Sequence, residues 1–484
     1  MNFFRQTKDT FIRIYDEMGY VTNQLTWQDR IFEETGRDFL SVVKRDVQEV
    51  NFAVNILSDI YQEIPFDEIY KDFVIFLRDL ENEGFILTGD TLSEIEESEP
   101  SFSYDYRVNK IKNLQDETLK IDTTSIEDYL YQFHKRKPTL FAVQFELTSK
   151  CNERCIHCYI PNSKKDKAFS LDYLTLIKTL EEARNMGVLS ITLSGGEPFL
   201  YKEINSVINK CRELDFQISI LSNLTRITDD NLNVLRKSNI SQIQVSLYSM
   251  KPEEHDKVTM VPGSFKKTMH NIEKLIENNI PIVISTPIMK TNVNSYKDVL
   301  IWAESKNLKT VTDYILMAQS NFSTSNLDYR IDLNETKVLI QDIVKNNKNY
   351  SALLNAKTSC TVIDDKKNKD WLDQPICGVG MDVLCLGANG DFYPCSGWQN
   401  YAVGNVYSKS LSDIWLNSEK LNNLRKIRNK DFEECVNCDL RDYCAMCLVR
   451  NFNESNGDLY KINKHYCKVA LINKQVAEEY LLNK

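Results

Sequence analysis

Short apolar runs alternate with amphipathic segments between residues 139 and 345. Each run has the length of a strand and is followed by a helical pattern, with apolar residues three or four positions apart. The predicted strands are 141–147, 216–221, 243–247, 282–288 and 311–316, and the predicted helices are 203–214 and 263–280. Repeated strand–helix units predict parallel strands with right-handed crossovers. About six units would form an α/β partial barrel, (β/α)6, with its site at the carboxyl ends of the strands.

Pattern and composition divide the rest of the chain into three further segments. Residues 1–95 lack cysteine and mix strand and helix patterns, 96–138 are acidic and then mixed polar, and 346–484 are rich in cysteine. The middle segment is typical of a linker. The last contains Asn389-Gly390-Asp391, a hairpin turn by sequence, and ends in a helical pattern at 470–482.

The N-terminal segment predicts a small winged-helix-like domain. Two strand patterns, 10–15 and 20–23, form a hairpin with Gly19 expected in its turn. A helical pattern at 70–80 is followed by Gly84, a good helix stop, and then by a short strand.

Length and charge narrow the possible functions. A chain of 484 residues is too long for one core, and two to four domains are expected. The net charge of -10 disfavours nucleic-acid binding, because phosphates require a basic surface. No apolar run is long enough to span a bilayer, and the N-terminus lacks the apolar core of a signal peptide. We therefore expect a cytoplasmic protein that binds neither nucleic acid nor membrane.

The cysteines carry most of the chemical information. There are 13, an odd number, and a reducing compartment disfavours disulfides. Cys151, Cys155 and Cys158 follow the first predicted barrel strand in a C-x3-C-x2-C run. Three thiolates can hold three irons of a [4Fe-4S] cluster and leave the fourth iron open. A zinc site would need a fourth ligand, and no fourth cysteine lies nearby.

A second motif follows one strand–helix unit later, where the chain reads Ser194-Gly195-Gly196-Glu197-Pro198. Together the two motifs resemble the radical S-adenosylmethionine (SAM) superfamily. The resemblance implies that Cys151, Cys155 and Cys158 hold the catalytic [4Fe-4S] cluster and that the glycine-rich backbone binds the methionine amine of SAM. The residues implied in SAM binding are His157, Ser194, Gly195, Gly196, Glu197, Pro198, Ser222, Asn223 and Ser246.

This chain departs from the superfamily pattern at two positions. His157 stands where an aromatic residue is usual, and Ser246-Leu247-Tyr248-Ser249 replaces the common Ser-x-Asp. Cys211 belongs to neither motif. It lies on the apolar face of the helix predicted at 203–214 and is expected in the core.

The C-terminal region contains a second group of cysteines with regular spacing. They are Cys377, Cys395, Cys435, Cys438, Cys444, Cys447 and Cys467, with Cys385 among them. The pattern resembles the SPASM extension of radical SAM proteins, which holds two auxiliary [4Fe-4S] clusters, although Cys444-x2-Cys447 replaces the usual x3 spacing. A zinc ribbon at 435–447 is the alternative.

The SPASM resemblance implies two ligand sets. The outer cluster would be held by Cys435, Cys438, Cys444 and Cys467, and the inner one by Cys377, Cys395 and Cys447. The fourth ligand of the inner cluster stays open between Cys385 and Cys360. Cys385 lies in a strand-like run and could instead be core. If neither ligates, an iron is left for a substrate thiolate or amide.

SPASM proteins mostly act on peptides, and the N-terminal segment resembles the PqqD-like element that binds leader peptides by strand addition. The resemblance implies that a 5′-deoxyadenosyl radical abstracts hydrogen from a ribosomally made precursor peptide, and that a flavodoxin or ferredoxin donates the electron. A thioether from a Cys sulfur to carbon is the first choice of product. Carbon–carbon cross-linking and epimerisation are alternatives. So are a protein oxidase like the anaerobic sulfatase-maturing enzymes and a non-catalytic metal scaffold.

Overall fold

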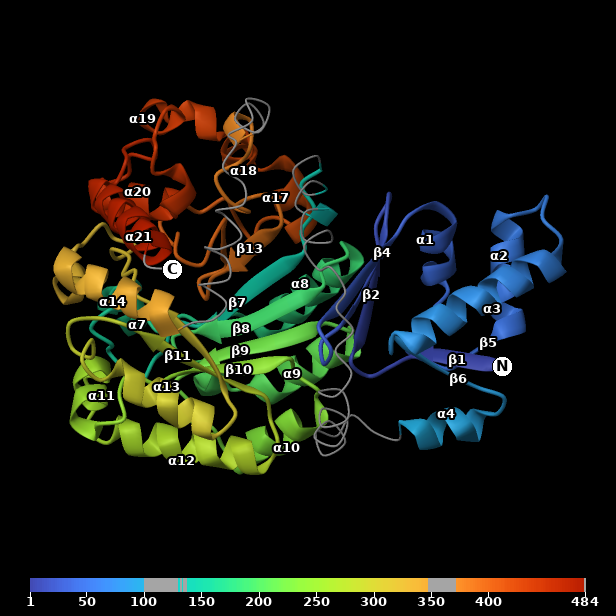
Figure 1. Ribbon diagram of the computed structural model, residues 1–484. Coiled ribbons are helices and arrows are strands. Elements are labelled where there is room, and N and C mark those ends of the chain that lie inside the picture. The colour runs from blue at the N-terminus through green and yellow to red at the C-terminus, as the bar shows by residue number, and fades with distance from the viewer. Residues whose placement is uncertain (100–128, 131–132, 134–136, 347–370, 483–484) are drawn as a thin grey trace.

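The computed structural model describes residues 1–99, 129–130, 133, 137–346 and 371–482. Its centre is one twisted sheet of nine strands in the order β12-β11-β10-β9-β8-β7-β13-β14-β15 (Figure 1). Six consecutive strands are parallel and form the predicted partial barrel. They are β7 (Ala142–Thr148), β8 (Ser190–Gly195), β9 (Gln217–Ser222), β10 (Gln242–Ser246), β11 (Ile282–Pro287) and β12 (Lys309–Asp313). The last strand begins two residues before the predicted 311 and ends three residues earlier.

Helices cover the outer face of the barrel (Figure 1). Those that follow the strands are α7 (Asn162–Asp166), α8 (Tyr173–Asn185), α9 (Ile204–Glu213), α10 (Asp229–Lys237), α11 (Pro252–Thr259), α12 (Ser264–Glu277) and α13 (Tyr296–Ser305). Strand residues such as Val143, Phe145 and Ile191 pack against these helices in the largest apolar core. Cys211 is fully buried in that core, as predicted. The alternate strand residues face the barrel interior, because side chains alternate across a sheet.

The C-terminal region extends the barrel sheet, which the sequence did not predict. Strand β13 (Val383–Leu386) pairs in parallel with β7, and β14 (Asp391–Tyr393) and β15 (Gly404–Asn405) continue the sheet. The predicted turn between β13 and β14 is confirmed, and Gly390 has φ +85° there. The two regions therefore share one hydrogen-bonded sheet.

The remaining C-terminal elements are mostly helical. They are α17 (Leu411–Asn417), α18 (Glu419–Leu424), α19 (Glu433–Val436), α20 (Leu448–Glu454) and α21 (Lys464–Leu482), with 3-10 turns η3 (Asn429–Asp431) and η4 (Arg441–Tyr443). The barrel region also contains α14 (Leu333–Asn346) and the 3-10 turns η1 (Pro198–Leu200) and η2 (Ser325–Tyr329). The closing helix α21 starts six residues before the predicted 470 and packs on α14. Within the described residues, no helix is long and apolar enough to cross a membrane.

The N-terminal segment contains two small sheets and four helices. The first sheet has the order β5-β1-β6 and the second β2-β3-β4. The elements are β1 (Phe3–Gln6), β2 (Thr10–Ile14), β3 (Gly19–Asn23), β4 (Gln28–Phe32), α1 (Glu34–Ser41), β5 (Gln48–Glu49), α2 (Val50–Ile60), α3 (Phe66–Asn82), β6 (Ile86–Gly89) and α4 (Leu92–Ser98). The predicted hairpin is β2–β3, but Gly19 begins β3 and does not lie in the turn. Strand β4 was not predicted. Gly84 has φ +77° at the end of α3.

The stretch expected to be a linker, 96–138, is only partly described. Helix α4 continues into it as far as Ser98. Phe133 is buried against Tyr15 and Tyr20 of the second N-terminal sheet and against Leu189 of the barrel. Residues 100–128 lie outside the described residues.

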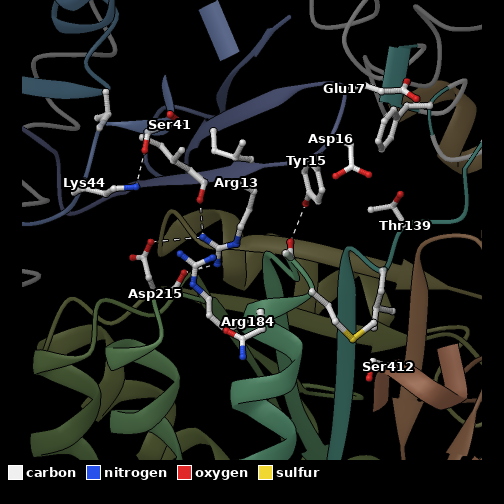
Figure 2. A pocket seen from close by; sticks show the side chains of 18 of the residues that line it. Arg13, Tyr15, Asp16, Glu17, Ser41, Lys44, Thr139, Arg184, Asp215 and Ser412 are labelled. Atoms are coloured by element: carbon white, nitrogen blue, oxygen red, sulfur yellow. Dashed lines mark hydrogen bonds and ion pairs between the residues drawn. The ribbon is translucent and has the colours of Figure 1, made fainter. Parts of the chain in front are cut away.

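The β2–β4 sheet docks on the barrel at the amino-terminal ends of the barrel strands. Arg13 donates to the carbonyl oxygens of Val188 (2.9 Å) and Asp215 (2.6 Å), and Tyr15 Oη donates to Gly187 O (2.9 Å). These barrel residues come just before β8 and β9. A cavity of about 820 Å³ lies at this joint, bordered also by α17 (Figure 2). It lies at the end of the barrel opposite the predicted site.

Replacing Arg13 tests how strongly the β2–β4 sheet is held on the barrel. It is 1% exposed, and burial together with the nearby Arg184 lowers its pKa to about 10, although Asp215 counteracts this. We expect Arg13→Ala to destabilise the joint by about 3 kcal/mol, because several buried polar groups lose their partner. Differential scanning calorimetry would show an earlier transition for the variant. Lys137→Ala, which removes an exposed ion pair with Asp16, is the control and should change nothing measurable. Identical transitions for both variants would show that Arg13 does not hold the joint.

Candidate active site

The C-x3-C-x2-C loop begins three residues after β7 ends, at the carboxyl-terminal rim of the barrel. Backbone bonds attach it to its neighbours on both sides. Arg154 N donates to Thr259 O (3.0 Å) at the end of α11, and Glu197 N donates to Lys150 O (2.8 Å). The thiols of Cys151, Cys155 and Cys158 are partly buried and free. The fold thus places all three cysteines where a barrel of this kind has its active site.

The two glycines of the second motif allow the end of β8 to approach this loop closely. A Cβ on Gly195 would lie 2.4 Å from Thr148 O, and one on Gly196 would lie 2.2 Å from Lys150 O. Gly195 also has φ +137°, which a larger residue rarely adopts. Gly196 N donates to Thr148 O (2.7 Å). The motif therefore fixes the residues that immediately precede Cys151.

Glu197 links the second strand to the third. Its carboxylate is fully buried and accepts hydrogen bonds from Ser222 Oγ (2.7 Å), Asn223 N (2.9 Å) and Phe199 N (3.1 Å). Burial raises its pKa to about 7 despite these bonds. Glu197 therefore positions Ser222 and Asn223 through direct hydrogen bonds. Pro198 opens the short helix η1 behind it.

A cavity of about 220 Å³ lies at the cysteine loop. Its lining contains most of the residues predicted to bind SAM, namely His157, Ser194, Gly195, Gly196, Ser222, Asn223 and Ser246, together with the three cysteines. Glu197 and Pro198 do not line it. Residues far apart in the chain thus converge at the ends of four adjacent strands, as the motif spacing requires.

Tyr248 is a site residue that the sequence reasoning missed. Its hydroxyl lies 3.1 Å from His157 Nε2 and 3.7 Å from Cys155 Sγ, and the two rings meet edge to face. Burial lowers the pKa of His157 to about 4, so the imidazole is neutral. Tyr248 comes two residues after Ser246, at the position where the usual Ser-x-Asp has its acid. Strand alternation could have placed it in the site.

Two charged groups beside the cysteines were also missed. Lys165 on α7 is 4% exposed. Burial by itself lowers its pKa, but Cys158, Cys151 and Cys155 together raise it above the usual value. Glu153 lies inside the motif, 2% exposed, and burial raises its pKa to about 7. A lysine ammonium next to three thiolates favours their deprotonated form.

The donor set fits an iron–sulfur cluster better than a single ion. In the parts of the chain that the structure describes, no three Cys, His, Asp or Glu side chains converge on one metal position. Cluster ligands need not do so, because each thiolate binds a different iron. Burial raises the pKa of Cys151 to about 11, and binding to iron would reverse this effect.

The SPASM cysteines separate into two groups in the structure. Cys435, Cys438, Cys444 and Cys467 line one cavity of about 460 Å³, and the pKa of Cys435, raised to about 11 mainly by burial, also responds to the other three. Cys377 behaves similarly: burial raises its pKa to about 11, with contributions from Cys447 and Cys395. The assignment of these cysteines to an outer and an inner cluster stays a prediction. Cys447 also borders the 460 Å³ cavity of the outer group, so the two groups are adjacent.

Cys385 is buried on β13, near Glu146 and near Cys395 of the inner group. It is 1% exposed, with its pKa raised by burial, then by Glu146, and then by Cys395. Glu146 itself is buried on β7, and its carboxylate accepts a hydrogen bond from Gln399 Nε2 at 2.7 Å on each oxygen. Cys360, the other candidate for a fourth ligand, lies outside the described residues.

Comparison with protein families agrees with this arrangement. Residues 145–303 match the radical SAM superfamily, and residues 377–439 match the SPASM iron–sulfur cluster-binding domain. The chain carries a radical SAM domain followed by a SPASM domain. The radical SAM domain binds SAM and a [4Fe-4S] cluster, and the SPASM domain binds auxiliary iron–sulfur clusters.

Individual relatives are distant. An AdoMet-dependent heme synthase of Methanosarcina barkeri is 22% identical over 67% of this chain and 95% of its own length. The antilisterial bacteriocin subtilosin biosynthesis protein AlbA of Bacillus subtilis is 23% identical over 64% of this chain and 68% of its own length.

Solved structures show the same fold over different shares of the chain. Streptococcus suis SuiB bound to its precursor peptide SuiA superposes with a TM-score of 0.61 at 16% identity, over 93% of this chain and 97% of SuiB. The protein anSMEcpe, with bound AdoMet and Cp18Cys peptide, superposes with a TM-score of 0.53 at 15% identity, over 72% of this chain and 98% of its own. The match to SuiB therefore includes much of the N-terminal segment, whereas the match to anSMEcpe leaves more than a quarter of this chain without a counterpart.

Proposed function

We propose that this protein is a radical SAM enzyme that modifies a ribosomally made precursor peptide. The observation that carries the proposal is the N-terminal segment joined to a radical SAM and SPASM core. The fold match to SuiB, which was solved with its precursor peptide, covers 93% of this chain. AlbA, named for bacteriocin biosynthesis, and SkfB of Bacillus subtilis, named for maturation of a sporulation killing factor, support the same substrate class.

The N-terminal segment would act as the PqqD-like leader-binding domain. Strand β4 is the outer strand of its sheet, and all five of its residues are partly exposed. Helix α3 lies beside β4: Phe76 packs edge to face on Phe32 (5.1 Å), and Glu83 pairs with Arg30. A leader peptide that adds as a strand to β4 would contact α3 with alternate side chains.

The chemistry proposed first is a thioether between a peptide Cys sulfur and a carbon. SAM, once bound and cleaved with one electron from the donor, would supply the radical that takes one hydrogen atom from a peptide carbon. The peptide thiol would lose its proton as the C–S bond forms, and an auxiliary cluster would take up the remaining electron. Cys377, Cys395 and Cys447 would hold the inner cluster and leave one iron for the peptide sulfur. Cys151, Cys155 and Cys158 would hold the SAM cluster, with Lys165 compensating its negative charge.

Two rival functions follow from specific matches. A heme synthase activity is favoured by the 22% identity over 95% of that relative. A protein oxidase of the sulfatase-maturing type is favoured by the fold of anSMEcpe. Each of those proteins is matched almost completely, yet about a third or a quarter of this chain remains unmatched. The unmatched part, which we assign to the N-terminal domain, would bind a part of the substrate that those two proteins do not bind.

Anaerobic co-expression with the small peptide encoded beside the gene tests the proposal. We expect the intact mass of the peptide to fall by two hydrogens per event, with one Cys alkylation site lost each time. Co-expression with the Cys155→Ala enzyme is the control and should leave the mass unchanged. The same mass loss with every Cys still alkylatable would indicate carbon–carbon cross-linking. An unmodified peptide together with turnover of a porphyrin or of a sulfatase peptide would contradict the proposal.

A further inference from the structure

In the part of the chain that the structure describes, β12 is the outermost strand of the barrel, and no strand pairs with its outer edge. Among the described strands it pairs with β11 alone, whereas the opposite edge of the barrel continues into β13–β15. All five residues of β12 are exposed, and Val311 is 48% exposed. Exposed edge strands present unsatisfied N–H and C=O groups that can pair with another extended chain.

The direction of the unpaired groups follows from the strand register. Ile288 N on the chain after β11 donates to Asp313 O (2.7 Å), so the backbone of Asp313 faces β11. In a parallel pair, successive residues point their N–H and C=O groups to alternate sides. Val311 therefore also faces β11, and Thr310 and Thr312 present their N–H and C=O groups to the open side.

The amino-terminal end of β12 contacts the N-terminal domain. Lys309 Nζ lies 4.4 Å from the ring centroid of Trp27, in the turn between β3 and β4. The same turn region is fixed to the barrel by Gln24, which donates to Asn239 O (3.1 Å) and accepts from Ser241 Oγ (2.6 Å). Strand β4, the edge proposed to take the leader, thus begins next to the first residue of β12.

The carboxyl-terminal end of β12 leads to the candidate active site. Asn326 donates both to His157 O (3.2 Å) in the cysteine loop and to Met317 O (2.8 Å), four residues beyond β12. The side chain of Met317 also lies against Gly397, two residues after Cys395. A chain that follows β12 from its amino-terminal to its carboxyl-terminal end would arrive between the SAM-cluster loop and the inner cysteines.

We propose that β12 binds the extended segment of the precursor that joins its leader to its modified part, by adding that segment as a further strand of the barrel sheet. The inference rests on the proposed function. Five residues of strand span about 17 Å, enough to carry the peptide along the barrel from the N-terminal domain to the rim. The exposed Val311 and the threonines favour β-branched or apolar residues in the peptide.

Hydrogen exchange of the anaerobic holoenzyme, with and without the synthetic full-length precursor encoded beside the gene, tests the proposal. Without reductant, so that no chemistry occurs, the peptide should slow exchange at the amides of Thr310 and Thr312 by about tenfold or more. The amide of Val311, already bonded to β11, should change little.

A proline substitution gives a second measurement. Thr312→Pro removes an N–H that points away from β11, which an edge strand tolerates. We expect peptide affinity to fall by about tenfold in fluorescence anisotropy, because one or more backbone bonds are lost. Thr312→Val keeps the N–H and should bind as the parent does. The thermal transition and peptide-independent SAM cleavage should be the same in all three proteins.

The outcomes separate this inference from the proposed function. A peptide that is bound and modified without protection at Thr310 and Thr312, and with equal affinity for Thr312→Pro, overturns the β12 proposal and leaves the function standing. Slow exchange at both amides before peptide is added would show that the edge is already covered, and would also overturn it. A peptide that is neither bound nor modified overturns both proposals.

Discussion

Cys158→Ala should reduce the formation of 5′-deoxyadenosine from SAM to the level of a protein-free control. The thiol would hold one iron of the SAM cluster, and the loop that carries it has no spare cysteine to replace it. The SPASM cysteines form separate groups, so the auxiliary clusters should remain. We expect the variant to lose about four of about twelve irons per chain, measured by iron analysis after anaerobic reconstitution.

Cys211→Ala is the matched control for this loss. Cys211 is fully buried in the apolar core behind β9, and burial alone raises the pKa of its thiol. Its replacement should leave both the iron content and the cleavage of SAM unchanged, at the cost of a small cavity. If Cys158→Ala still cleaved SAM at the parent rate, the assignment of the cluster to this loop would be wrong.

The sequence was sufficient to locate the functional residues that directly follow a predicted strand. The C-x3-C-x2-C loop and the Gly195-Gly196 motif each follow a strand directly, so their places at the barrel rim could be inferred from the strand–helix alternation. The N-terminal hairpin of β2 and β3 could be predicted for the same reason, since its two strands are adjacent in the chain. Local periodicity reports neighbours in sequence, and these features depend on such neighbours.

Features that depend on distant contacts could not be read in this way. Strand β13 pairs with β7 across more than two hundred residues, and no periodicity specifies that partner. Lys165 and Glu146 are ordinary charged residues in the sequence, and only the folded chain buries them beside cysteines. Strand β4 was missed because its five residues, Gln28–Phe32, contain three polar ones and no clear alternation. Its partners, rather than its composition, make it a strand.

Gly196→Ala should weaken SAM binding and cleavage by about 100-fold or more. The added Cβ would lie 2.2 Å from Lys150 O and 2.6 Å from Ser149 O, both backbone atoms, so the cysteine loop would have to move. A displacement of about 1 Å at a reacting centre can cost about 100-fold in rate. Equilibrium dialysis of SAM and the rate of 5′-deoxyadenosine formation, both measured on reconstituted enzyme, would report the two effects separately.

Gly263→Ala distinguishes this steric effect from a general loss of glycine. Gly263 has φ +79°, and no atom lies within 4 Å of the position that a Cβ would take, so alanine there costs only about 1 kcal/mol of backbone strain. We expect that variant to bind and cleave SAM as the parent does, with a slightly lower thermal transition. Equal SAM affinity in Gly196→Ala and the parent, at full iron content, would show that the approach of β8 to the cysteine loop does not determine the SAM site. A loss confined to Gly196→Ala would show that the glycine motif acts by allowing the two backbones to meet.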